Sequence, residues 1–194
     1  MRIYFLSLAM LLTFLTSSAH ATLVVEPLIG HNFAGKAEIH GGGDKYTGIN
    51  GLGYGGRVGF SKLGFSLMAD YLRSNLDMHD GDFSKKLNTN EFAGLVGFRF
   101  PILLKVYGGY IFNADGDSRY KGGGGGSSQS FKLNSGHGMK IGAGWTLFPL
   151  LDINLEYRKI QFDDYKVGGS KNSSNVDLSA WMLSVSLPFR FFEN

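Results

Sequence analysis

The last stretch of the chain, residues 176–192, constrains the fold most. It reads VDLSAWMLSVSLPFRFF, and every odd position from Trp181 to Phe191 is apolar, while the even positions include serine, proline and arginine. Alternation with a period of two predicts a β-strand with one apolar and one more polar face. Its length matches the about 9–11 residues that a tilted strand needs to cross a bilayer, whereas strands of soluble proteins average about five or six. The pattern therefore predicts a transmembrane β-strand with an aromatic end at the membrane boundary.

The first residues have the features of an export signal. Arg2 precedes an apolar run over residues 3–15, and residues 16–21 (TSSAHA) end in an A-x-A cleavage pattern. The apolar run is shorter than the about 20 residues that a membrane-spanning helix requires. We expect residues 1–21 to be a cleaved signal peptide and residues 22–194 to form a single domain.

Composition excludes several classes of protein. The chain has no cysteine, so disulfides and cysteine-ligated metals are excluded. Removing residues 1–21 takes away Arg2 and no acidic residue, which leaves 18 basic and 16 acidic residues. That balance argues against nucleic-acid binding. Glycine, at 29 of 194 residues, is about twice as common as usual. Composition alone would also admit a soluble β-sandwich or a lipocalin-like barrel, so strand lengths and connections must decide.

Eight alternating segments can be read along the chain. They cover residues 23–33, 46–60, 63–75, 89–100, 104–113, 133–148, 152–165 and 176–192. The connections near Ser61, Pro101 and Pro149 are short, whereas the others, which begin at residues 34, 76, 114 and 166, are long and polar. Short turns at one end and long loops at the other are typical of outer-membrane barrels, in which every backbone amide is paired. The fold we predict is all-β: an eight-stranded antiparallel transmembrane up-and-down β-barrel.

With these features the chain resembles the small eight-stranded outer-membrane proteins of Gram-negative bacteria, the group of the OmpA barrel domain, OmpX and the Opa adhesins. The resemblance covers residues 22–194 and rests on architecture rather than on a sequence motif. It implies a bacterial outer-membrane location, contact with outer-membrane lipid and lipopolysaccharide, and insertion by the barrel-assembly machinery. It also implies long loops that would meet an extracellular ligand. One feature departs from the group: its members usually end on an aromatic residue, whereas Glu193 and Asn194 follow Phe192 here.

Charged residues recur on the face of the strands that would point inward. They are Glu26, Asp70 and Glu156 on the acidic side and Arg57, Arg99, Lys105, Lys140 and Arg158 on the basic side. An eight-stranded barrel is only just wide enough inside for its side chains. We therefore predict a network of salt bridges that fills the lumen. The alternative is a narrow ion path lined by the same charges.

Candidates for catalysis or metal binding are sparse. The histidines at 31, 40, 79 and 137 lack any paired ligand spacing, so we expect no metal and no cofactor. Ser135 and His137 share a parity, and Asp163 on the next strand could complete an outward Ser-His-acid set, as in a lipid A-modifying enzyme. Because Ser and His near a loop are mostly solvated surface, we expect no catalysis. We expect instead a monomer with a structural or surface-interaction role, in envelope integrity or in adhesion through its four long loops.

Overall fold

The computed structural model describes residues 21–40, 45–80, 83–120, 129–148, 150–167, 170–172 and 175–191. The predicted signal peptide lies outside these residues, apart from Ala21. No helix among the described residues has the length and hydropathy to cross a membrane.

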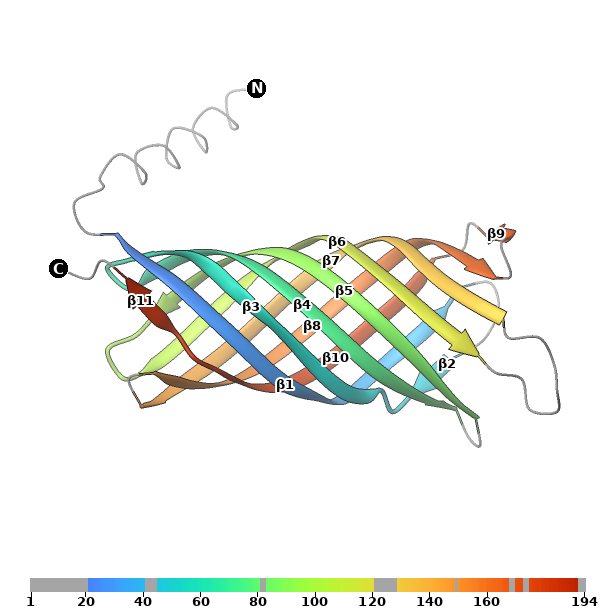
Figure 1. Ribbon diagram of the computed structural model, residues 1–194, viewed down its shortest axis with the longest axis horizontal. Coiled ribbons are helices and arrows are strands. Elements are labelled where there is room, and N and C mark those ends of the chain that lie inside the picture. The colour runs from blue at the N-terminus through green and yellow to red at the C-terminus, as the bar shows by residue number, and fades with distance from the viewer. Residues whose placement is uncertain are drawn as a thin grey trace, which may run out of the picture.

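The described residues form one antiparallel sheet that closes into a barrel (Figure 1). Its eight long strands are β1 (Thr22–Ile39), β3 (Asn50–Lys62), β4 (Phe65–Asp80), β5 (Phe83–Arg99), β6 (Leu104–Tyr120), β7 (Gln129–Phe148), β8 (Leu151–Val167) and β10 (Val176–Ser186). Each pairs with the next, and β10 pairs with both β8 and β1, which leaves no open edge in the wall. Three short strands, β2 (Lys45–Thr47), β9 (Ser170–Asn172) and β11 (Phe189–Phe191), extend this wall. The predicted eight-stranded antiparallel barrel is confirmed.

The two ends of the barrel differ. The start of β1 and the strand β11 lie at one end, and β2 and β9 lie at the other (Figure 1). Tight turns connect the strands at the first end, where Lys62 pairs with Phe65 across a two-residue turn. The second turn residue, Gly64, has a positive φ of 85°, a conformation that glycine adopts without a steric cost. We call this the short-turn end; it corresponds to the periplasmic side in the family that the chain resembles.

The strands continue further toward the other end than the sequence predicted. Three of the four segments that we expected to be long loops are largely strand: β1 runs to Ile39, β4 and β5 pair as far as Asp80 opposite Phe83, and β6 pairs with β7 as far as Tyr120 opposite Gln129. The prediction of four long loops is therefore wrong for the connection that begins at residue 76, where only residues 81 and 82 separate the paired ends. The glycine-rich run 122–126 lies outside the described residues.

The extra strand length carries the barrel well past a membrane. A strand of 17 residues, such as β5 or β8, rises about 43 Å if it climbs about 3.3 Å per residue at a tilt of about 40°. The apolar band of an outer-membrane barrel is only about 25 Å tall. About 15–20 Å of wall therefore extends beyond the band, and we call this part the upper tier and the remainder the lower tier.

The outer surface changes from apolar to polar at one level around the barrel. In the lower tier, large hydrophobic side chains such as Leu155 and Leu183 face outward. Aromatic side chains end this belt, including the contacting pair Tyr157 and Trp181, whose ring centroids are 5.0 Å apart. Two residues further along β8, the outward residue is the exposed Lys159. The belt therefore has the aromatic upper border that is typical of a membrane–water interface.

The interior changes in the opposite sense at about the same level. In β8 the inward residues Glu156 and Arg158 are followed by Ile160 and Phe162, both with 0% exposure. The same change occurs in the neighbouring strands, so that an apolar cluster fills the upper tier. Most members of the cluster lie there, and Ala93 and Leu95 extend it along β5 past Glu91 into the lower tier. The members are Ala37, Tyr46, Ile49, Leu76, Met78, Leu87, Ala93, Leu95, Ile111, Ala114, Leu133, Ile160, Phe162, Val176 and Leu178. The lower tier is thus apolar outside and mainly charged inside, with the small apolar cluster of Leu28, Leu72 and Met182 beside the charges. The upper tier is polar outside and apolar inside.

This arrangement predicts that the upper tier is held together as a soluble barrel would be. We expect Ile160→Asn to lower the free energy of unfolding by at least about 3 kcal/mol, because it loses buried methyl groups and leaves an amide without partners. Gln161→Asn, on the outward face one residue away, should change it by no more than about 0.5 kcal/mol. Denaturant titration of the protein refolded into lipid vesicles measures both. Equal effects would mean that the upper tier has no packed apolar core.

Candidate functional site

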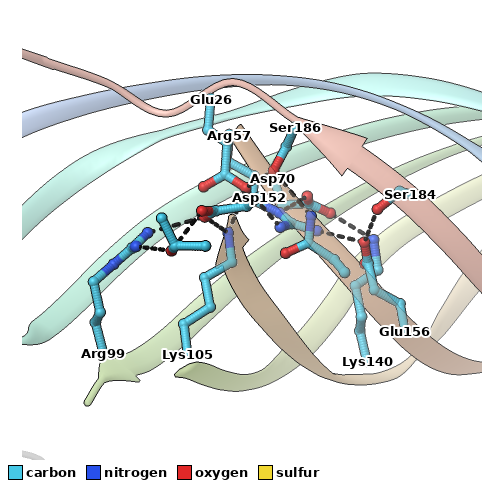
Figure 2. A network of polar contacts seen from close by, with 12 residues as sticks. Glu26, Arg57, Asp70, Arg99, Lys105, Lys140, Asp152, Glu156, Ser184 and Ser186 are labelled. Carbon is cyan, nitrogen blue, oxygen red and sulfur yellow. Dashed lines mark hydrogen bonds and ion pairs between the residues drawn. The ribbon is translucent and has the colours of Figure 1, made fainter. Parts of the chain in front are cut away.

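Arg57 on β3 occupies the middle of the lower tier and binds three carboxylates at once (Figure 2). Its Nε donates to Asp70 Oδ1 at 3.0 Å, its Nη1 to Glu26 Oε1 at 3.3 Å, and its Nη2 to Glu156 Oε1 at 2.8 Å. The ring of Tyr107 covers the guanidinium, with 4.6 Å between Arg57 Cζ and the ring centroid. All four charged side chains are at most 3% exposed. The planar guanidinium has five donors in a fixed geometry, which suits it to join several acids.

The ion pairs continue from Arg57 in both directions as a ladder of alternating charge. Successive partners lie 2.6–3.9 Å apart, and the longest step is the one between Lys140 Nζ and Glu91 Oε2. Nine residues form the line of the ladder, and a tenth, Glu156, is bound to Arg57 at its side. The order along the ladder, starting at the short-turn end, is Arg99, Asp152, Lys105, Glu26, Arg57, Asp70, Lys140, Glu91 and Arg158. No charge in the ladder is adjacent to one of its own sign.

All eight charged residues that the sequence predicted for the interior are members of this ladder. Arg99 is the most exposed of them, at 24% of its side chain, because it lies nearest the short-turn end. Two members were not among the predicted residues: Glu91 on β5 and Asp152 on β8, both with 0% exposure. Their signal was present in the sequence, because three predicted acids against five predicted bases leave an excess of buried positive charge. With both added, five acids match five bases.

Hydroxyl side chains complete the coordination of the acids. Ser186 on β10 donates to Glu26 at 2.6 Å, and Ser184 on the same strand donates to Glu156 at 3.2 Å. Thr146 donates to Asp152 Oδ1 at 2.7 Å and also contacts the Arg99 guanidinium. Desolvating each charge costs several kcal/mol, and only multiple partners of good geometry offset that cost. Strand β10, which has no charge of its own in the ladder, thus contributes two of these hydroxyls, and β7 contributes the third.

Glycines on the inner face make room for the long side chains of the ladder. A Cβ atom at Gly144 on β7 would lie 2.6 Å from Lys105 Cε and 2.4 Å from Asn154 Oδ1, and one at Gly142 would lie 2.5 Å from the Tyr107 ring. These approaches are shorter than any van der Waals contact. Gly142 and Gly144 are therefore required by the bulk of the interior side chains beside them.

The charge ladder borders a small cavity. A cavity of about 40 Å³ lies at the lower end of the ladder, between Glu26, Lys105 and Arg99. That is room for about three water molecules, since one water needs about 10–15 Å³ measured in this way. Among the described residues, no three His, Cys, Asp or Glu side chains are grouped so as to hold a metal ion.

The outward set considered for catalysis is only partly assembled. His137 Nδ1 lies 3.6 Å from Asp163 Oδ2, and the two side chains are 41% and 53% exposed. Ser135 has a left-handed φ of 56° in β7, and within the described part of the chain it makes no hydrogen bond to His137. A nucleophile needs an adjacent base within about 2.6–3.2 Å. The three side chains therefore do not form a triad in this structure.

A closed antiparallel barrel with a lipid-facing apolar belt and paired charges inside is a transmembrane β-barrel of the outer-membrane type. The comparison with protein families identifies it further. Residues 6–189 match the family described as outer membrane protein beta-barrel domain, and the chain belongs to that family.

Solved structures share this fold at low sequence identity. The Ail protein, the attachment invasion locus protein of Yersinia pestis, matches with a TM-score of 0.55 and 14% identity over 88% of this chain and 99% of that chain. Its complex with the heparin analogue sucrose octasulfate matches with a TM-score of 0.57 and 15% identity over the same shares. Neisserial surface protein A matches with a TM-score of 0.51 and 18% identity over 87% of this chain and 99% of that chain. The search of curated proteins finds no significant match.

The ladder predicts that Arg57 is far more important for stability than a surface cation. We expect Arg57→Met to lower the free energy of unfolding by about 3–5 kcal/mol, because it leaves three buried carboxylates without their shared partner. The control is Lys159→Met, which removes an outward cation that is 55% exposed and 3.9 Å from Asp177. It should cost no more than about 1 kcal/mol.

Denaturant titration at low and high salt measures both variants. The cost of Arg57→Met should be nearly independent of salt, since the ladder is shielded from ions in solution, whereas the small cost of Lys159→Met should disappear at high salt. Similar costs for the two variants would contradict a stabilising role of the ladder.

Proposed function

We propose that this protein is a closed, non-conducting outer-membrane scaffold with a structural or surface-interaction role. The observation that carries the proposal is the occupation of the interior by two different fillings, a neutral charge ladder in the lower tier and an apolar cluster in the upper tier. A conducting pore needs a continuous polar path, and a dry apolar constriction opposes it. Closure of the lumen leaves the outer surface of the upper tier and its connections as the part that can meet a partner.

The chemistry of the upper tier supports a role in surface interaction. Charges of both signs alternate across neighbouring strands, as in Asp77 opposite Lys86 and Asp117 opposite Lys132. Such a mixed, hydrated surface on a rigid wall is suited to a polar macromolecular partner rather than to one strongly charged polymer. Ail, which has the same fold, is named for attachment and invasion, and this supports the adhesive form of the role.

The other expected partners belong to the same proposal. Lipopolysaccharide would surround the upper border of the belt, where the outward Arg73 follows Tyr71. The barrel-assembly machinery would insert the chain after export and removal of residues 1–21. The protein would remain a monomer, since its wall has no unpaired long strand.

The enzyme alternative is less well supported. The His137–Asp163 contact favours it, but both side chains are solvated, and among the residues that the structure describes no activated nucleophile adjoins them. We therefore expect no catalysis.

Closure of the lumen predicts the absence of channel activity, even after the ladder is interrupted. Arg57→Ala and Arg99→Ala should conduct no more than the unaltered protein in planar bilayers, because the packed apolar cluster of the upper tier remains. Conductance steps that grow when either arginine is removed would favour the alternative of a narrow ion channel.

The proposed role has two forms, adhesion and envelope integrity, and one experiment can distinguish them. Bacteria that produce the protein should bind cultured animal cells better than bacteria that lack it, and deleting residues 121–128 should reduce binding to the background level. The control variant, Val25→Ile, changes an outward side chain near the opposite end of the barrel and should bind fully. If binding is unaffected by the deletion while both variants restore the detergent resistance of a deletion strain, the role is envelope integrity and not adhesion. If neither binding nor resistance depends on the protein, the proposal is wrong.

A further inference from the structure

The short-turn end of the barrel opens into a cavity that is rich in cations. Its volume is about 590 Å³, within the range of small-molecule sites. Three of its lining side chains are cationic and three bear hydroxyl groups, and no carboxylate is among the described residues that line it. These six are Lys62, Arg99, Arg190, Thr22, Ser61 and Thr146. We call this cavity the lower mouth.

The charge ladder adds to the positive character of the lower mouth. Its first member is a cation, Arg99, which Asp152 holds in place at 2.9 Å from the interior side. Lys62 and Arg190, which are not members of the ladder, line the lower mouth beside Arg99. Arg99 and Arg190 also line the 40 Å³ cavity above, so they connect the lower mouth to the ladder.

The turns around the lower mouth are unusually apolar. Their tips include Leu63, Ile102, Phe148 and Leu150, which are 88%, 72%, 66% and 54% exposed. Turn tips that face water are ordinarily polar, and a group of large apolar side chains at this exposure indicates an apolar surrounding. The apolar belt therefore reaches the very end of the barrel. That places the lower mouth among the lipid headgroups of the adjacent leaflet and not in open solvent.

We infer that the lower mouth binds the phosphate group of an anionic phospholipid from the leaflet at the short-turn end. The arginine and lysine side chains would donate charge-assisted hydrogen bonds to the phosphate oxygens, and the hydroxyls of Ser61 and Thr22 would complete the site. The acyl chains would lie against the apolar turns outside. The barrel thereby selects a negatively charged headgroup at one leaflet, a property separate from any binding at its upper tier.

Native mass spectrometry of the protein extracted from membranes tests this inference. The protein is mixed with phosphatidylglycerol, which is anionic, or with phosphatidylcholine, which is zwitterionic, and the bound lipid is counted. We expect preferential retention of phosphatidylglycerol, and we expect Lys62→Gln/Arg190→Gln to weaken it about twenty-five-fold, since each cation near a membrane surface contributes about fivefold. Arg99 is left unchanged because its loss would disturb the ladder.

The matched control is Lys36→Gln/Lys86→Gln, which removes two exposed cations from the upper tier and should retain the lipid as the unaltered protein does. Resistance of the barrel to SDS without heating shows that each variant is folded. Equal retention of the two lipids, or equal effects of the two double variants, would overturn the inference. Full displacement by soluble glycerol 3-phosphate would also overturn it, because the ligand would then be a soluble phosphate ester and not a lipid.

Discussion

The ion pairs of Arg57 with Glu26, Asp70 and Glu156 are the interaction on which the lower tier depends. A membrane-spanning sheet must close so that every backbone amide is paired, and closure at eight strands leaves an interior that only side chains can fill. Charged side chains can fill it only if each is paired with a charge of opposite sign, because an unpaired buried charge costs several kcal/mol of desolvation free energy that is not recovered. The equality of five acids and five bases is therefore a physical requirement of this interior. The glycines opposite the long side chains follow from the same requirement.

The two tiers place their polar and apolar side chains in opposite ways because they face different solvents. Below the aromatic border the surrounding medium is lipid, so apolar side chains face outward and the polar ones are enclosed; above it the medium is water, and the order is reversed. Strand β8 shows the change within four residues, from the inward Arg158 and outward Tyr157 to the inward Ile160 and outward Lys159. The parity of the strand does not change at this point. The inward positions change from charged to apolar residues and the outward positions from apolar to charged ones. The strand itself continues without interruption across the boundary.

The sequence predicted those strands in which apolar and polar residues alternate as expected for a wall between lipid and a polar interior. Strands in the belt were predicted because Ile153 and Leu155 alternate with Asn154 and Glu156, and the inward charges followed from their parity. The upper strands were mistaken for loops, because their outward residues are polar and the inward Leu76, Met78 and Leu87 were not recognised as one face. Bulges set a further limit. The buried residues of β1 are even-numbered up to Asn32, whereas the odd-numbered Ala37 is buried after the irregularity between Asn32 and Ala34. Only cross-strand pairing determines such a shift.

The ladder also constrains the order in which the barrel can be assembled. Most of its contacts join residues far apart in sequence: Lys105 and Glu26 are 79 residues apart, and Arg57 and Glu156 are 99 apart. Ser186 on the closing strand reaches Glu26 on the first strand. None of these pairs can form before the strands between them are in place, so the ladder forms late and its members remain hydrated until closure. Interactions absent from the transition state for folding act mainly on the rate of unfolding. The charged interior of the lower tier therefore contributes chiefly to the persistence of the closed barrel, whereas the hairpins and the apolar faces of the strands, whose contacts are local, account for how it begins to form.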